Sequence, residues 1–469
     1  MPYSNERSPR LGHVPVVNNA AVAAALARWE ITHARPNDSH SIQALCKPLE
    51  ALPSLTVASS ISFAITVDGS DVEVEATRHY PTVKVGYLRI AGSFVDLSKL
   101  LRVNAEPFVD PAKVRESHSE SSIDAALPGS GLTIAGLTGV ETWRRELNRF
   151  LASTRFDEDS TLTLADTLLT MFGHPGSPVT AIGLGTCPVC REHDYSGQRP
   201  IRVTKEGSEC PFCKSEVYLS DVLRTHEEYA PEGSNQTALT RVMLIAERLM
   251  TLSYLDHIYT QTPRPEEVFK QTIFITDGPL ALFGVVAPLK RRLYSYNEAL
   301  FRWADSRGVV APLLVGIEKT GRFVEHAELI IDLIPRGHVM MLSSEYINRI
   351  TGRPVDNVYG KDEFYGRRFI YRTTAGDPLV ITVPPRPGVL PYEGSGAESF
   401  DSYPTLRTVC EVLDSVRTRL YPNAVIPVAL AHTAASLPLG IGQSVLRAMA
   451  QRGIGIPQDT QMRQRTHRH

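Results

Sequence analysis

The sequence predicts an α/β fold with one small module inserted into its core. Short apolar runs rich in β-branched residues, typical of buried strands, alternate along the chain with longer segments of helical periodicity. Between residues 174 and 236 this alternation gives way to a stretch that carries two Cys-x-x-Cys pairs. We therefore expect a core built from two parts of the chain, with the cysteine module between them.

Length and composition set broad limits. The chain has 469 residues, of which 42% are hydrophobic and 21% charged, enough for two or three domains or for one large core with insertions. The net charge of −2 gives no global sign of a nucleic-acid partner, so any basic surface must be local. The N-terminus, MPYSNERSPR, is too polar for a secretory signal, and the apolar stretches are too short to span a membrane. A soluble, cytoplasmic protein without a membrane partner is expected.

The first half of the chain reads as a helical extension followed by strands. Residues 1–54 form the predicted extension, and 55–173 the first part of the core. The expected elements, in chain order, are an Ala-rich helix over 18–31, strands over 55–67 and 82–97, a Ser-, Gly- and Pro-rich loop over 110–140, and an amphipathic helix from Glu141.

The second half, 237–452, reads as a mixture of helices and strands that completes the core, followed by a basic, disordered tail over 453–469. The expected elements are helices over 238–259 and 287–308, strands over 273–276 and 309–319, a hairpin over 367–385 that turns at 375–377, a loop over 385–404, and helices over 405–420 and 433–453.

The cysteines predict a structural metal site. Cys187, Cys190, Cys210 and Cys213 form two Cys-x-x-Cys pairs separated by 19 residues, a spacing that can place four thiolates around one Zn²⁺. Because protein ligands fill all four positions, such a zinc ion has no open site for a substrate. The module is either a recognition element for DNA or a partner, or a metal staple for a segment too small to fold alone. We favour the staple, because few aromatic or basic residues cluster there.

Two Asp-Gly pairs follow β-branched runs. Asp68 closes the run 64–67 and Asp277 closes the run 273–276, where Gly278 and Pro279 indicate a turn. Asp277 is therefore either a turn former or part of a metal site. Carboxylates on adjacent strand ends can hold two divalent cations about 4 Å apart, the arrangement of two-metal phosphodiester cleavage.

Glu247 is the candidate for a third carboxylate. It lies in a largely apolar helix that is expected to be buried against the sheet, where an unpaired acid is costly. Two alternatives stay open: a solvated face formed with Arg241 and Arg248, or Glu146 from an earlier helix as the third ligand.

Five local strings occur in an order that resembles the NurA nuclease family, specifically the bacterial members with an inserted zinc ribbon. They span most of residues 60–450 and are VDGS (67–70), FITDGPLALFG (274–284), VGIEKTGRF (315–323), FYGRRFIYRT (364–373) and YPNAVIPVALAHTAA (421–435). The resemblance implies an RNase H-like core with a mixed sheet flanked by helices, Mn²⁺- or Mg²⁺-dependent DNA cleavage, a homodimer, and a hexameric HerA-type ATPase as partner.

The resemblance also implies roles for individual residues. The family's acidic residues fall on Asp68, Glu247 and Asp277, its C-terminal histidine falls on His432, and Tyr421 stands in a Tyr-Pro pair that such proteins often show. His432 is then a metal ligand or a group that positions water or phosphate, the alternative being a buried histidine with a hydrogen-bond partner. Lys319, at the end of another strand, is expected to contact phosphate, or else is an exposed strand-end lysine.

Local basic clusters are the candidates for DNA contact. One cluster, Lys290, Arg291 and Arg292, begins a helix shortly after Asp277. A second is the hairpin with its arginines and aromatics, namely Phe364, Tyr365, Arg367, Arg368, Tyr371 and Arg372. For both, core aromatics with solvated charges are the alternative.

Two function classes follow. The first is a metal-dependent deoxyribonuclease that works with a HerA-type translocating ATPase in DNA end processing, repair or anti-phage defence. The second is a non-catalytic adaptor that binds DNA or the motor on the same scaffold. Another phosphoryl-transfer enzyme is a third possibility, but the chain has no GxxxxGK[ST] loop, which argues against a nucleotide hydrolase.

Overall fold

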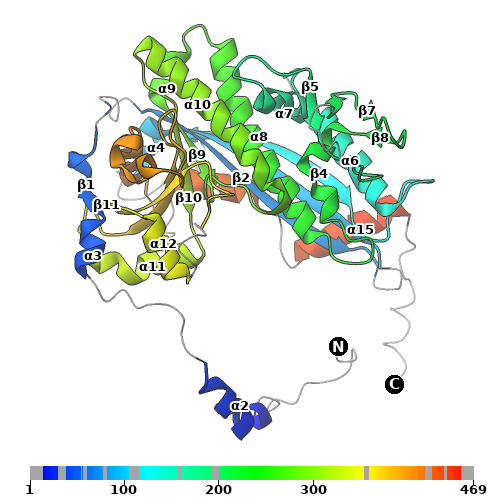
Figure 1. Ribbon diagram of the computed structural model, residues 1–469, viewed down its shortest axis with the longest axis horizontal. Coiled ribbons are helices and arrows are strands. Elements are labelled where there is room, and N and C mark those ends of the chain that lie inside the picture. Colours follow the sequence, from blue (N-terminus) through cyan, green and yellow to red (C-terminus); the bar gives the residue numbers. More distant parts are fainter. Residues whose placement is uncertain are drawn as a thin grey trace.

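The computed structural model describes residues 14–29, 39–53, 55, 61–77, 82–104, 116–156, 160–192, 200–352, 359–417, 425–437 and 441–455. Tyr421 and most of the predicted tail lie outside these ranges. Within them the predicted α/β fold, a mixed sheet flanked by helices, is confirmed (Figure 1).

A sheet of nine strands runs through the described part of the chain, in the order β1-β11-β12-β13-β10-β9-β2-β3-β4. β9 pairs in parallel with β2 and β10, and every other neighbouring pair is antiparallel. The strands are β1 (Cys46–Pro48), β2 (Phe63–Glu75), β3 (Lys84–Asp96), β4 (His118–Pro128), β9 (Thr272–Asp277), β10 (Leu313–Glu318), β11 (His338–Met341), β12 (Arg367–Arg372) and β13 (Pro378–Val383).

One face of the sheet is covered by long helices. Their apolar side chains pack on Ile65 and Val67 of β2 and on Phe274 of β9, and a second cluster continues over β11 to β13 on the same face. These helices are α6 (Gly139–Ser153), α7 (Leu164–Phe172), α8 (Gln236–Gln261), α10 (Lys290–Arg307), α11 (Arg322–Ile330) and α12 (Ser344–Thr351). We call this the α8 face.

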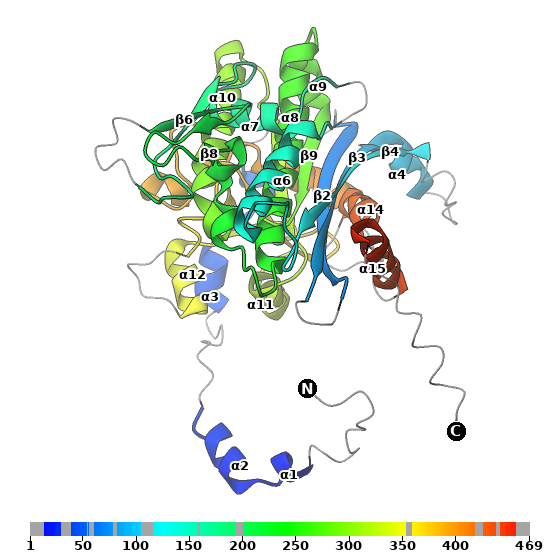
Figure 2. The ribbon, with the colours of Figure 1, turned by 90° about the vertical axis from the view of Figure 1, so that its right-hand side faces the viewer.

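The opposite face is covered by one helix that directly follows β3 and by helices from the C-terminal part of the chain. Ala64 of β2 and Ile273 and Ile275 of β9 pack here against Leu413 and Val428. The helices are α4 (Leu97–Asn104), α13 (Leu406–Ser415), α14 (Ile426–Ala435) and α15 (Ile441–Ile454). We call this the α14 face. Figure 2 shows α14 and α15 on one side of β2 and β3, with α6 and α8 on the other.

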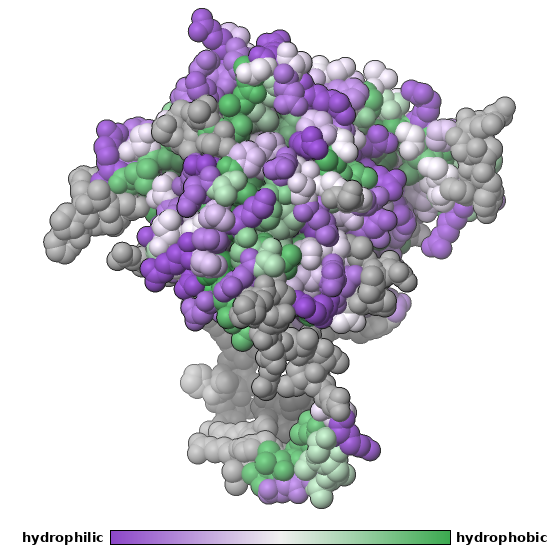
Figure 3. All heavy atoms as spheres, turned by 60° about the vertical axis from the view of Figure 1, so that its left-hand side comes forward, coloured by the Kyte–Doolittle hydropathy of each residue, from purple (hydrophilic) through white to green (hydrophobic). Residues whose placement is uncertain are grey.

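The remaining helices are short. They are α1 (Val14–Val17), α2 (Ala20–Leu26), α3 (Ser39–Ala44) and α9 (Pro265–Gln271), with 3-10 turns at Leu49–Ala51, Leu219–Leu223, Thr225–Glu227, Gly284–Leu289, Ile331–Leu333, Ser395–Glu398 and Phe400–Ser402. No residue of α1 or α2 is buried, and these two helices form the lower, largely apolar end of the face in Figure 3. None of the described helices combines the length and apolarity that a membrane crossing requires.

Several segments differ from the sequence expectation. The region 110–140 was expected to be a loop, but it contains β4, an edge strand whose alternating polar residues hide its periodicity. β2 was expected to end at Asp68, but it continues to Glu75, because all thirteen of its residues pair with β3. Residues 284–289 form a 3-10 turn before α10 begins at Lys290. The hairpin at 375–377 is confirmed by the pairing of β12 with β13.

The cysteine module consists of two small hairpins, β5 (Ala181–Leu184) with β6 (Ile201–Thr204) and β7 (Ser208–Glu209) with β8 (Glu216–Val217). Its buried residues join the core cluster of the α8 face, which also contains Trp143 and Leu147 of α6. The module therefore shares the hydrophobic core of the main body. The domain boundaries derived from the sequence stay a prediction.

Candidate metal centre

Three parallel strands bring Asp68, Asp277 and Lys319 to one place. β9 lies between β2 and β10, with Val67 of β2 opposite Thr276 and Ile317 of β10 opposite Asp277. Because the three strands run in the same direction, residues that follow paired positions lie beside one another. Asp277 ends β9, Lys319 follows the last residue of β10, and Asp68 lies within β2 at the same level. β9 ends at Asp277, and Gly278 adopts a φ of 83°, which glycine accepts freely, so the chain turns there.

The two aspartates point to the α14 face. Successive side chains of a strand alternate between faces, and Ala64 of β2 and Ile275 of β9 pack on the α14 face. Asp68 lies four residues after Ala64 and Asp277 two residues after Ile275, so both share that face. The spatial convergence that a metal site needs is therefore present for this pair.

His432 completes the group from above the sheet. It lies on α14, which packs against β2, β3 and β9. Its Nδ1 is 2.8 Å from Oδ2 of Asp68 and 3.9 Å from Oδ2 of Asp277. One potential ligand atom from each of the three residues lies within 4.8 Å of the others. The helix predicted over 433–453 overlaps α14 only at residues 433–435, because Pro427 and the run of small residues obscure the periodicity of 426–432.

Asp68 is held in an environment that disfavours its charge. Its side chain is 7% exposed, and its Oδ1 accepts a hydrogen bond from the Gly69 amide at 2.8 Å. Burial and the nearby charge of Asp277 raise the pKa of Asp68 to about 6, although the hydrogen bond with His432 and the charge of Lys319 act in the opposite direction. A bound cation would reverse this balance, because it favours the ionised carboxylate.

Lys319 forms an ion pair with Asp277. It is the residue after the end of β10, and its Nζ contacts Oδ2 of Asp277. Its side chain is 23% exposed, so it is neither a free strand-end lysine nor a fully buried one. The ammonium group lies beside the acidic pair.

Glu247 lies on the other face of the sheet. It is on α8, and its Oε1 would be only 2.6 Å from a β-carbon at Gly69, whose missing side chain would point to the α8 face. Burial raises the pKa of Glu247 to about 8; the Arg248 guanidinium 3.4 Å from its Oε2 opposes this, and the charges of Asp68 and Asp277 add to the rise. Glu247 is thus buried against the sheet, as expected, but it does not belong to the group of three. Glu146, half-buried on α6, does not belong to it either.

The solvated-face alternative for α8 is wrong for Glu247 and Arg248. Both side chains are buried, and Nη2 of Arg248 donates to the Pro279 carbonyl at 3.0 Å. Arg248 therefore ties α8 to the turn that follows Asp277. The sequence signal for this contact was the arginine itself, since a cation in an apolar helix requires a buried acceptor.

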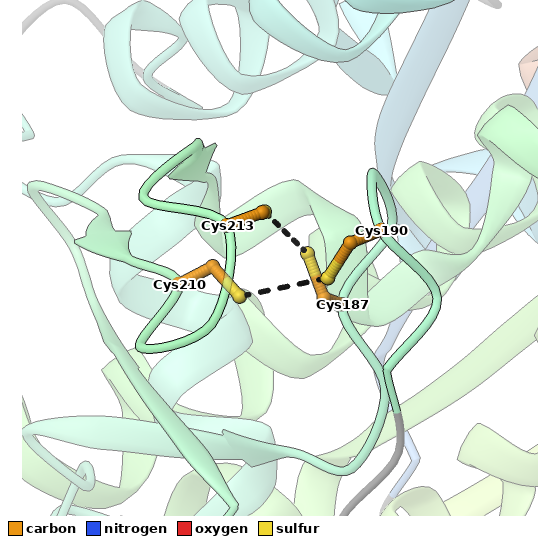
Figure 4. Close-up of side chains that lie close together, drawn as sticks. All are labelled: Cys187, Cys190, Cys210 and Cys213. Carbon is orange, nitrogen blue, oxygen red and sulfur yellow. Dashed lines mark hydrogen bonds between the residues drawn. The ribbon is translucent and has the colours of Figure 1, made fainter.

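The four cysteines form a second group, shown in Figure 4. Sγ of Cys187 is 3.8 Å from Sγ of Cys213, and Sγ of Cys190 is 3.9 Å from Sγ of Cys210. Thiolates about 2.3 Å from a tetrahedral zinc ion would be separated by roughly 3.8 Å, so the distances fit this metal.

The two cysteine pairs also share one backbone conformation. After each pair stands a residue with positive φ, Arg191 at 59° and Lys214 at 64°. Arg191 donates its amide to the Cys187 carbonyl, and Lys214 donates to the Cys210 carbonyl, both at 3.0 Å. The two turns are therefore equivalent halves of the four-cysteine group.

A buried ion pair ties the module to α6. Nε and Nη2 of Arg144 contact the two carboxylate oxygens of Asp221 at 2.8 and 2.7 Å, and both residues are almost fully buried. Nη2 also donates to the Glu216 carbonyl in β8 at 2.9 Å. Sequence reasoning missed this pair, because its partners are 77 residues apart.

Two of the hairpin arginines do not form a DNA surface, which corrects the sequence expectation for them. Arg367 and Arg368 are buried, and Arg368 pairs with Glu318 at 2.6 and 3.2 Å. Phe364 and Tyr371 are also buried. Antiparallel pairing on both sides of β12 encloses these side chains between the sheet and its covering helices.

The cluster Lys290, Arg291 and Arg292 lines a hollow of about 950 Å³ near Asp362 and Glu363. Nζ of Lys290 contacts the Lys361 carbonyl, and the Arg292 guanidinium lies 4.7 Å from the Phe172 ring. Arg291 and Arg292 are exposed. The cluster begins α10, whose buried residues pack on the α8 face, so it does not share the face of Asp68 and Asp277.

No protein-family model matches the chain, and no curated protein sequence matches it. Among solved structures, the chain is similar to the NurA nuclease from Sulfolobus solfataricus, with 8% identity, a TM-score of 0.34, and coverage of 96% of this chain and 98% of that chain. It is also similar to another NurA structure (11% identity, TM-score 0.29, 95% and 98% covered) and to NurA with manganese (11% identity, TM-score 0.23, 96% and 99% covered).

At these identities and TM-scores, the likeness does not establish an activity, a metal or a partner for this protein. The proposed function therefore rests on the geometry of the metal centre.

Proposed function

We propose that this protein is a metal-dependent deoxyribonuclease that hydrolyses phosphodiester bonds at the Asp68–Asp277–His432 centre. The observation that carries the proposal is the convergence of these three side chains on one face, with ligand atoms within 4.8 Å of one another. Two carboxylates and an imidazole are donors that Mn²⁺ accepts, and carboxylates also suit Mg²⁺. The donor set fits such a cation.

Each residue of the centre has its own proposed role. Asp68 and Asp277 would hold the cation, which supplies an activated water and stabilises developing charge on the phosphate. Nδ1 of His432 faces Asp68, so Nε2 is the nitrogen of this largely exposed ring that could ligate the cation or meet water or a phosphate oxygen. Lys319 offers a positive charge beside Asp277 for a phosphate oxygen.

Glu247 is the remaining acid that the resemblance assigns to the centre. Its position on the α8 face, behind Gly69, means that it would have to approach the cation past the strand. Its role as a third ligand stays a proposal that substitution tests.

Substrate and partners belong to the same proposal. DNA is the proposed substrate, and a homodimer with a HerA-type ring ATPase the proposed assembly, acting in end processing, repair or anti-phage defence. A net charge of −2 and a basic cluster flanked by Asp362 and Glu363 support a nuclease with weak DNA affinity of its own. A translocating motor would deliver the strand to such an enzyme.

The test is cleavage of end-labelled single- and double-stranded DNA with Mn²⁺, with and without a HerA-type ATPase. We expect Asp68→Asn and Asp277→Asn to abolish cleavage. Asp124→Asn is the matched control, because Asp124 is an exposed carboxylate of β4 paired with Arg89. Variants of Asp68 and Asp277 that cut as fast as the parent would end the proposal.

One observation favours the adaptor as the second candidate. Asp68 pairs with His432 and Asp277 with Lys319, so each of the two acids has a partner within the protein. Calorimetry on the zinc-loaded protein separates the two functions. The nuclease takes up Mn²⁺ at this centre, whereas the adaptor does not.

A further inference from the structure

The ion pair between Lys319 and Asp277 bears on how many cations the centre accepts. In a two-metal site, one carboxylate bridges the two ions with its two oxygens. Here one of those oxygens, Oδ2 of Asp277, is in contact with Nζ of Lys319. The Lys319 ammonium therefore occupies the place beside this Asp277 oxygen that a second cation would need.

The supply of ligands also limits the centre. Among the described residues, the group that can ligate here consists of Asp68, Asp277 and His432. Divalent Mg²⁺ and Mn²⁺ need several oxygen ligands each, and two ions usually share three or more carboxylates. Glu247 does not fill the gap from where it lies, because its carboxylate contacts the α8 face of Gly69 while Asp68 points to the α14 face.

The charges lead to the same result. Asp68 and Asp277 carry two negative charges and Lys319 one positive charge, which leaves a net charge of −1. One divalent cation brings the centre to +1, which a phosphodiester anion neutralises. Two divalent cations would bring it to +3, which a single phosphodiester anion would lower only to +2, so repulsion between the two cations and the Lys319 ammonium would oppose the second ion.

We propose that the centre takes one divalent cation, and that the Lys319 ammonium supplies the second positive charge to the scissile phosphate. This inference rests on the proposed nuclease function and replaces the two-metal arrangement expected from the sequence. Lys319 is then a catalytic residue, which donates hydrogen bonds to a phosphate oxygen while Asp277 holds its position.

The test counts Mn²⁺ ions on the zinc-loaded protein by electron paramagnetic resonance and calorimetry. Zinc is d¹⁰ and gives no paramagnetic signal, so only Mn²⁺ is observed. We expect the parent to bind one Mn²⁺ at this centre, with no spectrum of an exchange-coupled pair. Lys319→Met removes a competing charge-assisted contact, so it should bind Mn²⁺ about tenfold or more tightly while its DNA cleavage falls.

Two variants serve as controls. Lys319→Arg keeps the charge, so it should bind one Mn²⁺ with an affinity near that of the parent and retain more cleavage than Lys319→Met. Lys99→Met removes an exposed lysine paired with Asp96, far in sequence from the centre, and should change neither quantity. The thermal unfolding of each variant shows whether the fold is kept.

A coupled pair of Mn²⁺ ions in the parent would overturn the inference, as would Mn²⁺ affinity that is unchanged or weaker in Lys319→Met. These outcomes differ from a failure of the nuclease proposal. A protein that binds one Mn²⁺ and responds to Lys319→Met as expected, but cuts no DNA, keeps the cation inference and loses the function. A protein that cuts DNA with two bound ions does the reverse.

Discussion

Nδ1 of His432 lies 2.8 Å from Oδ2 of Asp68, although 364 residues separate them in the chain. The contact joins α14 to the middle of β2, on the same face as Asp277. The candidate metal centre is therefore set by how α14 packs across the sheet, and not by the strands alone.

Asp68→Asn should stabilise the protein at neutral pH when zinc is present but no other divalent cation is added. The pKa of Asp68 in the folded protein is raised from 3.8 to about 6. The protonated carboxyl group therefore stabilises the fold fully below pH 3.8, and this stabilisation is lost as the pH rises through 6. A shift of about two units corresponds to about 3 kcal/mol. Asparagine does not ionise, so the variant keeps this contribution. Urea unfolding between pH 5 and pH 8 measures it.

The parent should thus lose stability relative to Asp68→Asn across that range, and the gap should narrow toward pH 5. The matched control, Asp124→Asn, should show no such trend, because Asp124 is exposed. Equal free energies of unfolding for the parent and Asp68→Asn at pH 8 would contradict the burial of an unfavourable charge at this position.

Glu247→Gln tests whether Glu247 is a ligand. From its position behind Gly69, we expect Mn²⁺ affinity to stay within about twofold of the parent. Because the pKa of Glu247 in the folded protein is raised to about 8, its protonated form stabilises the fold, and this stabilisation is lost as the pH rises through 8. The variant should therefore keep its unfolding temperature at pH 9 better than the parent does. A large drop in Mn²⁺ affinity would instead identify Glu247 as the third ligand.

Removal of zinc should unfold the cysteine module and weaken the main body. The parent should contain one zinc per chain by elemental analysis, and Cys187→Ser should lose it. Structural zinc contributes on the order of 10 kcal/mol to small modules, and Cys187 and Cys210 belong to the core cluster of α6 and α8. The unfolding temperature should fall accordingly. Cys410→Ala, at a lone buried cysteine, should keep its zinc; loss of zinc there as well would show that the metal content reports general misfolding.

Arg144→Met should destabilise the protein by about 3–5 kcal/mol, because it leaves Asp221 buried without its cation. Chemical denaturation measures the change. The neighbouring Arg145 is exposed, so Arg145→Met should change stability by less than about 0.5 kcal/mol. If the two variants behave alike, the Arg144–Asp221 pair does not hold the cysteine module to α6.

Arg291→Ala and Arg292→Ala should weaken DNA binding about equally for all sequences, and each should reduce the salt slope by about 1. Arg302 is the control on the same helix, since it is exposed and pairs with Glu298. Binding is measured by fluorescence anisotropy over a series of salt concentrations. An unchanged slope in both variants would remove this cluster from the DNA path.

Local sequence patterns predicted many of the helices, strands and turns. The run ending in Asp277-Gly278-Pro279 predicted a strand and a turn, because β-branched residues and glycine act through their own backbone. β4 and most of α14 were not predicted, because an exposed edge strand and a helix of small residues show little hydrophobic periodicity. Asp68 was expected at a strand end, but pairing with β3 extends the strand beyond it. Strand pairing depends on two segments of the chain, so the sequence around Asp68 alone does not show it.

The sequence alone identified the four cysteines that come together, since the Cys-x-x-Cys spacing brings the two thiols of each pair close within one turn. It also determined that Asp68, Asp277 and His432 were candidates. Only the tertiary structure decided that Asp68, Asp277, His432 and Lys319 meet on one face while Glu247 lies on the other. The physical reason is that strand register and helix packing assign each side chain to a face, and both depend on contacts between segments far apart in the chain.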